Sequence, residues 1–327
     1  MKRTHWFMPF VMGMLLMFAV GCSDDSNETE QGADAGAEET TDQQGNSAEF
    51  PVTVTDGSGE EVTIEEEPET IVSLIPSNTE ITFALGQGDK LIGVDTYSNY
   101  PEEANDIEKI GAQEMDVEKI LSLDPDLALV TDFHQENNRD ILDKFEESGI
   151  DVVVVDSAES FDAVYDHIEL LGDVEGASEE ADELVGDMQS SLEKIKEKAE
   201  AVEEKKRVWV EVAPSPDIYT TGTGTFMNEM LEAIHAENTA ADQEGWVKMT
   251  EEEAVQKNPD VIITTYGYYV DNPEEQVLDR AGWAEVPAVK QEQVFDVNND
   301  TVTRPGPRLI DGVETLGKLI YPEVFTE

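Results

Sequence analysis

The feature that most constrains the fold is an internal repeat. The stretch MDVEKILSLDPDLAL, which begins at Met115, matches MTEEEAVQKNPDVII, which begins at Met249, without a gap. In each copy an Asp or Thr can cap a short helix, a proline ends that helix, and apolar residues then form a strand. We interpret the repeat as two similar lobes. The alternative is chance similarity of a common helix–proline–strand unit.

Alternating strand and helix patterns surround the first copy and predict an α/β fold with a mainly parallel sheet. Residues 50–64 alternate around the turn Asp56-Gly-Ser-Gly and predict a hairpin. Ser77-Asn-Thr-Glu80 fits a capping box and predicts a helix that ends at Gly86. We also expect strands at 71–75, 91–94, 127–130 and 152–155, and helices at 117–123 and 138–148.

A long helix is expected to join the lobes. Between Ser178 and Lys205 the chain has no proline, and apolar residues recur at helical spacing, which predicts one helix of roughly 25 residues. Further strands are expected at 207–212, 261–265 and 294–297, and helices at 226–236 and 307–320. We therefore expect an N-terminal lobe at 49–175, a linking helix at 176–205 and a C-terminal lobe at 206–327, with a ligand cleft between the lobes.

The N-terminus has the pattern of a lipoprotein signal peptide. Lys2 and Arg3 precede an apolar run of about 15 residues, shorter than the roughly 20 that span a bilayer. Small residues then precede Cys22, the only cysteine of the chain, which is typical of the lipobox of bacterial lipoproteins. We expect a signal peptide at 1–21, a lipid on Cys22 that holds the protein on the extracellular face of the cell membrane, and no disulfide bond. The alternative is a secreted protein with an incidental cysteine.

The chain is very acidic, with 75 Asp and Glu against 20 Lys and Arg and a formal net charge of −55. Loss of Lys2 and Arg3 with the signal peptide would leave 18 cations against 75 acids, or −57. Residues 22–48 contain no aromatic or branched apolar residue and predict a disordered acidic tether. Because salt screens such self-repulsion, we interpret the protein as halophilic, the alternative being a merely acidic protein. Its charge would repel phosphates, which excludes nucleic acid as a partner.

Several motifs together point to a known family. They are Ser77-Asn-Thr-Glu80, Phe83-Ala-Leu-Gly86, Ile92-Gly-Val94, Tyr97-Ser-Asn-Tyr-Pro101, Glu118 to Leu127, and Arg304-Pro-Gly-Pro-Arg308. Over residues 50–324 the chain resembles the substrate-binding proteins of ABC importers for cobalamin and iron siderophores, closest to the cobalamin-binding branch. The resemblance implies a class III fold with a rigid linking helix. It also implies a protein, expected to be a monomer, that captures cobalamin or a similar metal chelate and delivers it to an ABC permease dimer with its ATPase.

The resemblance further implies that one glutamate on each lobe docks onto arginines of the permease. Glu118 and Glu252 match those two positions, and the repeat places both in the first turn of equivalent helices. The alternative is that each acid only stabilises its own helix, because an acid in a first turn interacts favourably with the helix dipole.

Aromatic and polar residues in loops that follow strands predict the ligand site. A cluster of Tyr and Trp suits a large, flat, partly apolar ligand with polar edges, although core packing is the alternative for each aromatic. The resemblance implies that Tyr97 and Trp246 flank cobalamin and that Asp300 and Arg304 form a polar pair at its rim. The predicted ligand-binding residues are Ser77, Asn78, Tyr97, Tyr100, Tyr219, Trp246, Tyr266, Asp300 and Arg304.

One position departs from the cobalamin binders. Ala112 stands where they carry a tryptophan, which leaves a ferric siderophore or haem open as the ligand. Haem would take an axial Tyr or His, and Tyr97, Tyr100 and His134 are available for that role.

No enzyme motif accompanies these features. His134, His167 and His235 show no close metal-ligand spacing. The Gly-rich stretch from Thr221 to Phe226 lacks the residues of a P-loop or a dinucleotide fingerprint, and there is no Gly-x-Ser-x-Gly elbow. We therefore expect no catalytic residue, no metal site and no cofactor. The rivals from other classes are a surface hydrolase, which would turn a substrate over, and a structural surface protein, which would have no cleft.

Overall fold

The computed structural model describes residues 50–326. The predicted signal peptide, Cys22 and the predicted tether at 22–48 lie outside the described residues. The described part opens with the predicted hairpin, in which β1 (Val52–Thr55) pairs antiparallel with β2 (Glu61–Ile64). No helix between residues 50 and 326 is long and apolar enough to cross a membrane.

The first lobe is built on a parallel sheet with the strand order β4-β3-β5-β6. Neighbouring residues face opposite sides of the sheet, since Ile71 and Leu127 join one apolar core while Val72 and Ala128 join another. Both faces of the sheet are therefore apolar and have to be covered by helices, as in other parallel sheets. The strands are β3 (Ile71–Ser73), β4 (Leu91–Val94), β5 (Leu127–Thr131) and β6 (Asp151–Val155). The helices are α1 (Pro76–Ala84), α2 (Val117–Leu123), α3 (Asp132–Asn137), α4 (Arg139–Glu147) and α5 (Phe161–Glu175), with 3-10 turns at Gly88–Lys90 and Glu102–Asp106.

The second lobe repeats this topology. Its parallel sheet has the order β9-β7-β11-β12, in which each strand takes the place of its counterpart in β4-β3-β5-β6. An antiparallel pair, β8 with β10, is added beside it. The strands are β7 (Arg207–Glu211), β8 (Ile218–Thr221), β9 (Glu237–Asn238), β10 (Trp246–Met249), β11 (Val261–Thr264) and β12 (Val294–Asp296). The helices are α7 (Phe226–Ala233), α8 (Glu251–Lys257), α9 (Pro273–Leu278), α10 (Pro287–Lys290), α11 (Asn299–Thr303) and α12 (Leu309–Ile320).

The two copies of the sequence repeat fold alike. Asp116 and Thr250 each cap their helix, α2 and α8, by accepting a backbone N–H from its first turn. Both helices end at a left-handed residue directly before the proline, Asp124 with φ 53° and Asn258 with φ 49°. The prediction of two similar α/β lobes with mainly parallel sheets is confirmed.

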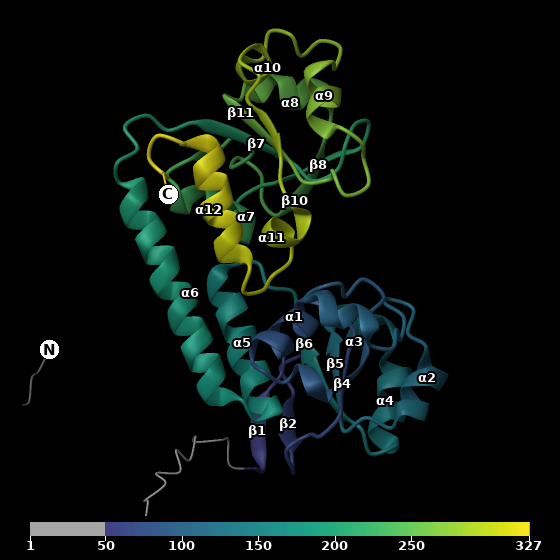
Figure 1. The fold of residues 1–327 in the computed structure, drawn as a ribbon. Helices are drawn as coiled ribbons and strands as arrows, with labels where there is room; N and C mark the ends of the chain where they lie inside the picture. Colours follow the sequence, from purple (N-terminus) through teal and green to yellow (C-terminus); the bar gives the residue numbers. More distant parts are fainter. Residues whose placement is uncertain (1–49, 327) are drawn as a thin grey trace, which may run out of the picture. The chain divides into compact units, whose positions relative to one another are not determined.

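A single long helix, α6 (Ser178–Ala199), joins the lobes and packs on α5, α7 and α12 (Figure 1). One apolar core continues from the first sheet through α5 and α6 to α12. The helix was predicted to reach Lys205, but it ends at Ala199. Ala199 is the last buried residue of its apolar face, and β7 begins at Arg207, so the chain has to turn back between them.

The predicted capping box at Ser77 is wrong. Helix α1 begins at Pro76, two residues before the start that a cap at Ser77 implies, and proline is favourable at the first helical position. No side chain caps this helix, and Ser77 lies inside its first turn. The predicted end is right, because Gly86 has a positive φ of 75° just beyond the helix.

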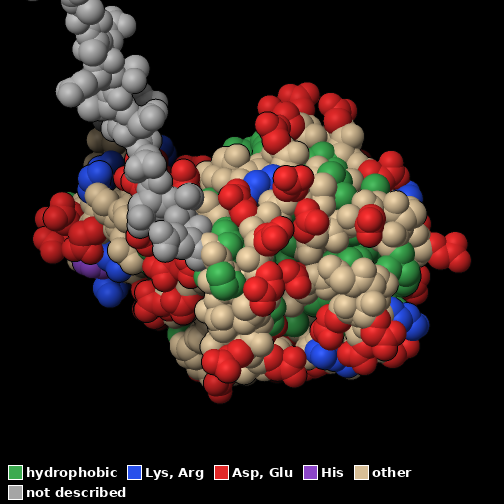
Figure 2. Space-filling model, turned by 90° about the horizontal axis from the view of Figure 1, so that it is seen from below, with side chains coloured by type: hydrophobic (Ala, Val, Ile, Leu, Met, Phe, Trp, Pro, Cys, Tyr) green, Lys and Arg blue, Asp and Glu red, His purple; other side chains and the backbone are tan. Residues whose placement is uncertain are grey.

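Acidic side chains cover much of the face shown in Figure 2, with few Lys and Arg between them. Pairs such as Lys90 with Glu67 and Lys318 with Glu314 account for some of the cations. Since 20 Lys and Arg cannot match 75 Asp and Glu, most carboxylates of the chain have no cation of their own to pair with.

Candidate functional site

Three adjoining pockets form a cleft between the lobes. Their volumes are about 700, 410 and 270 Å³, and Ile75, at the start of α1, lines all three. The first lobe contributes Tyr97 and Asp132 to the walls, and the second contributes Trp246 and Arg304. The predicted cleft between the lobes is therefore present.

The largest pocket, which we call the inner chamber, lies in the first lobe. It is lined by the residues that follow β3, β4 and β5, including Asp95 after β4 and Asp132 after β5. These loops meet because parallel strands end at the same edge of a sheet. Ala112 also lines the chamber. With only a methyl group there, this part of the wall offers no ring on which a ligand can stack.

Exposed aromatic side chains gather around the cleft. Of the seven large apolar side chains that are exposed among the described residues, four line the pockets: Tyr97, Phe133, Trp246 and Tyr268. Trp246 packs edge-on against Phe226, with ring centroids 6.0 Å apart, so its orientation is fixed. Exposed aromatics concentrated in one concave site are typical of ligand recognition.

Six of the nine predicted ligand-binding residues line the cleft. These six are Ser77, Asn78, Tyr97, Trp246, Asp300 and Arg304. Tyr100 and Tyr219 are exposed but lie outside the three pockets. Tyr266 is only 1% exposed and packs in the core, while Tyr268, two residues further on, lines the cleft. The sequence shows that this loop is rich in tyrosine, but a loop has no fixed period that would tell which ring turns outward.

His134 is not free to bind a metal. Its Nδ1 accepts the backbone N–H of Thr131 at 3.2 Å, so Nε2 carries the proton and donates to the carbonyl of Ala112 at 3.1 Å. Burial lowers the pKa of His134 below its usual value, which keeps the ring neutral. Within residues 50–326 no three His, Cys, Asp or Glu side chains are grouped to hold a metal. Of the three predicted axial ligands for haem, Tyr97 and His134 line the cleft and Tyr100 does not. His134 is only 2% exposed, which leaves Tyr97, 70% exposed, as the accessible one.

An ion-pair network crosses between the lobes beside the cleft, and we call it the interlobe latch. Glu80 of α1 is 3% exposed and accepts hydrogen bonds from Arg308 Nε at 2.8 Å and Nη2 at 2.7 Å. Arg304 lies 3.5 Å from the same carboxylate and 3.0 Å from Asp300. The Arg308 guanidinium also stacks 3.8 Å from the centre of the Tyr100 ring. Sequence reasoning missed Glu80 and Arg308 as partners, and the scarcity of cations was the only signal that could have pointed to them.

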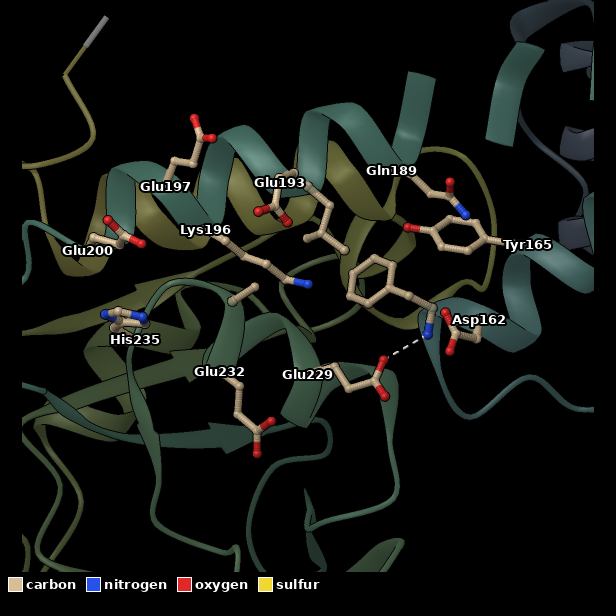
Figure 3. Close-up of a pocket in the computed structure, with 13 residues that line it drawn as sticks. Asp162, Tyr165, Gln189, Glu193, Lys196, Glu197, Glu200, Glu229, Glu232 and His235 are labelled. Atoms are coloured by element: carbon tan, nitrogen blue, oxygen red, sulfur yellow. Dashed lines mark hydrogen bonds between the residues drawn. The ribbon is translucent and has the colours of Figure 1, made fainter. Parts of the chain in front are cut away.

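A second concave region, of about 660 Å³, lies between α5, α6 and α7. Figure 3 shows its carboxylates, with Glu193 on α6 and Glu229 on α7 toward Lys196, while Glu197 points away from it. Glu229 accepts the backbone N–H of Phe161 at 2.8 Å, and burial raises its pKa. Helix surfaces form these walls, and none of the seven exposed large apolar side chains is among them. The interlobe cleft is therefore the better candidate for a ligand site.

Comparison with known proteins agrees with this geometry. Residues 71–301 match the periplasmic binding protein family. An uncharacterized ABC transporter substrate-binding lipoprotein of Bacillus subtilis, YvrC, is 48% identical over 97% of this chain and 98% of its own length. A vitamin B12-binding protein of Vibrio cholerae is 32% identical over 75% of this chain and 87% of its own. Among solved structures, a possible iron-binding periplasmic solute-binding protein of Staphylococcus epidermidis is 34% identical with a TM-score of 0.71, covering 78% of this chain and 100% of its own.

The chain thus belongs to the periplasmic binding protein family, as the sequence motifs indicated. It is a substrate-binding protein of an ABC transporter, with a permease, an ATPase and a small ligand as the partners that this class implies. Members of this family bind solutes for transport and are not enzymes.

Proposed function

We propose that the protein captures cobalamin, or a similar metal chelate, outside the cell membrane and delivers it to an ABC permease. The observation that carries this proposal is the gathering of exposed aromatic rings around one interlobe cleft. Flat rings on both lobes suit a ligand that is itself large, flat and partly apolar. The 32% identity to a vitamin B12-binding protein supports the same ligand.

We propose further that a lipid on Cys22 holds the protein at the outer surface. The 48% identity to a substrate-binding lipoprotein supports this, because it extends over nearly the whole of both chains. Anchored by a tether of 22–48, the cleft would stay within tens of ångströms of the membrane, which raises the local concentration over the permease.

A ferric siderophore is the second candidate ligand. Ala112 removes one stacking wall from the inner chamber, which favours a ligand that is less flat than a corrin ring. The likeness to a solved structure described as a possible iron-binding protein points the same way. Haem is the third candidate, with Tyr97 as its axial ligand.

Docking through Glu118 and Glu252 is also part of the proposal. Both carboxylates are exposed, and each lies in the first turn of its helix, α2 in one lobe and α8 in the other. Because the two lobes share one topology, the glutamates occupy equivalent positions and suit a permease that is itself a dimer.

Binding without turnover is the test of this function. The full-length chain, purified in high salt, is titrated by calorimetry with cyanocobalamin, ferric siderophores and haem in separate runs. We expect saturable binding of cyanocobalamin and recovery of the ligand unchanged. Trp246→Ala should weaken that binding by about 5- to 150-fold, since stacking on an aromatic ring contributes about 1–3 kcal/mol. Tight binding of a siderophore with no heat from cyanocobalamin would transfer the proposal to the second ligand.

A further inference from the structure

The charges around the cleft constrain the ligand more closely than its aromatic rings do. Five carboxylates line the three pockets, and one arginine is the only Lys or Arg among the described residues that line them. The acids are Asp95, Glu114, Asp132, Asp156 and Asp300, and the arginine is Arg304. The cleft therefore has an excess of four negative charges.

The single arginine is already paired inside the protein. Its guanidinium lies 3.0 Å from Asp300 and 3.5 Å from Glu80, and it donates a hydrogen bond to Asn99 at 3.1 Å. An anionic group of a ligand would have to compete with these carboxylates for it. The two histidines that line the cleft, His134 and His167, do not reverse this balance, because even two further positive charges would leave the five acids in excess by two.

The whole chain is acidic, so acids in the cleft need no special explanation. The informative fact is that the cleft is acidic as well and does not gather the few cations of the chain. A site for an anion in a chain with 20 cations and 75 acids has to concentrate some of those cations, because the surrounding field opposes the ligand. Apart from the paired Arg304, no lysine or arginine of residues 50–326 lines the three pockets.

The hydrogen-bonding groups of the cleft indicate what does fit. A carboxylate only accepts hydrogen bonds, so the acids call for a ligand edge with N–H or O–H donors. Asn78 lines the smallest pocket, is almost fully buried, and its Nδ2 has no acceptor in the structure. A buried donor without a partner is costly and calls for an acceptor from the ligand. A carboxamide carries both a donor and an acceptor.

We infer that the cleft takes a neutral or cationic metal chelate whose edge carries amide groups, and that it rejects chelates with free carboxylates, propionates or catecholates. This inference rests on the proposed function, since it names the charge class of the captured chelate. It favours cobalamin and cationic or neutral hydroxamate siderophores over haem and ferric catecholates.

Matched ligands that differ in charge, by one unit in the first pair below and by two in the second, test the inference. Cyanocobalamin is compared with its monocarboxylate derivatives, in which one peripheral amide has been hydrolysed to the acid. Ferrioxamine B, which carries a free ammonium group, is compared with its succinylated form. Affinities are measured by calorimetry at the lowest salt at which the protein stays folded, because salt screens exposed charges. In whichever pair binds, we expect the dissociation constant of the carboxylate form to be at least roughly tenfold higher than that of its partner. The reason is that like charges a few ångströms apart in a partly buried site repel each other strongly.

Variants place the effect in the cleft. Glu114→Gln with Asp132→Asn removes two cleft charges and should shrink the preference for the uncharged ligand at least threefold. Glu136→Gln with Asp140→Asn changes the net charge equally at two exposed acids that lie outside the pockets, four and eight residues after Asp132, and should leave the preference intact. Equal or tighter binding of the acids, or tight binding of only haem or a ferric catecholate, would overturn the inference and leave capture of a chelate standing. No binding of any chelate, whatever its charge, would refute the proposed function and the inference with it.

Discussion

We predict that the interlobe latch fixes the arrangement of the two lobes in addition to stabilising the fold, and a substitution at Glu80 can separate these two effects. Glu80→Gln keeps the size of the side chain and removes its charge. The change leaves Arg308 without the carboxylate that accepts its two hydrogen bonds, at 2.8 and 2.7 Å. Breaking a buried ion pair by removing one partner costs about 3–5 kcal/mol. Two neighbours would still stabilise the Arg308 cation: Asp300, 4.0 Å from its guanidinium, and the Tyr100 ring, on which it stacks. We therefore expect a loss at the lower end, about 3 kcal/mol of unfolding free energy.

The second lobe contains a matched control for this change. Glu211 is 0% exposed and accepts two hydrogen bonds from Arg280, both at 3.0 Å. The pair is as buried as Glu80 with Arg308, but both partners belong to one lobe. Glu211→Gln should therefore lower the unfolding free energy by a similar amount without loosening the two lobes from each other.

The assay is a distance measurement between the lobes. Spin labels are placed at Lys144 on α4 and Lys290 on α10, both exposed, in a chain that carries Cys22→Ser. We expect a clearly broader distance distribution for Glu80→Gln and an unchanged one for Glu211→Gln. If the distributions of the two variants agree with the parent, the latch does not set the lobe geometry. The packing of α6 on α5, α7 and α12 would then be sufficient to fix it.

Three further predictions follow from single features. Burial raises the pKa of Glu175 to about 8 from 4.5. Between these values the unfolded chain is ionised while the folded protein keeps the proton, so stability falls by about 1.4 kcal/mol per pH unit and levels off above pH 8. Glu175→Gln should abolish this decline, which urea unfolding at pH 5 and pH 8 measures, and a decline of equal slope in the variant would refute the assignment. Glu118→Lys with Glu252→Lys should reduce uptake of the ligand to background with unchanged affinity, whereas reversal of the exposed Glu136 and Glu285 should not; normal uptake in the first double variant would exclude docking at these residues. Lowering the salt concentration should lower the melting temperature by several degrees, because fewer counterions screen the acidic surface; a melting temperature that is independent of salt would contradict the halophilic interpretation.

The topology was predictable because the same sequence pattern occurs once in each lobe. The repeat aligns α2 and β5 with α8 and β11, and each copy has a capping side chain, a proline and an apolar strand at matching positions. Local signals of this kind depend on a few neighbouring residues. The pair β8–β10 had no such signal, because its strands are separated by helix α7 and β9 and recognise each other only in the folded lobe. Helix α5 was open to prediction, since Ser160 caps it and apolar residues recur along its buried face.

The site was predictable only as far as its loops. Loops after parallel strands meet at one sheet edge, so Tyr97 and Asp300 could be assigned to the cleft from their place in the chain. Which ring of a loop faces outward depends on the backbone path. For this reason the predicted Tyr266 is buried, and Tyr268 lines the cleft instead. The charge balance of the cleft could not be predicted from the sequence either. Every segment of the chain is acidic, and only the structure shows which acids share a pocket.

Glu80 shows how a local signal can be overruled by a stronger distant one. Its spacing from Ser77 fits a capping box, and a helix cap contributes typically about 1 kcal/mol. In the fold, Arg308 is largely buried beside α1, with its side chain 15% exposed, and breaking its pair with the buried Glu80 would cost about 3–5 kcal/mol. The stronger interaction prevails, so the carboxylate turns to the arginine of the other lobe and α1 begins at Pro76 without a side-chain cap. No local pattern can reveal this outcome, because the ion pair that prevails involves a residue more than two hundred positions away.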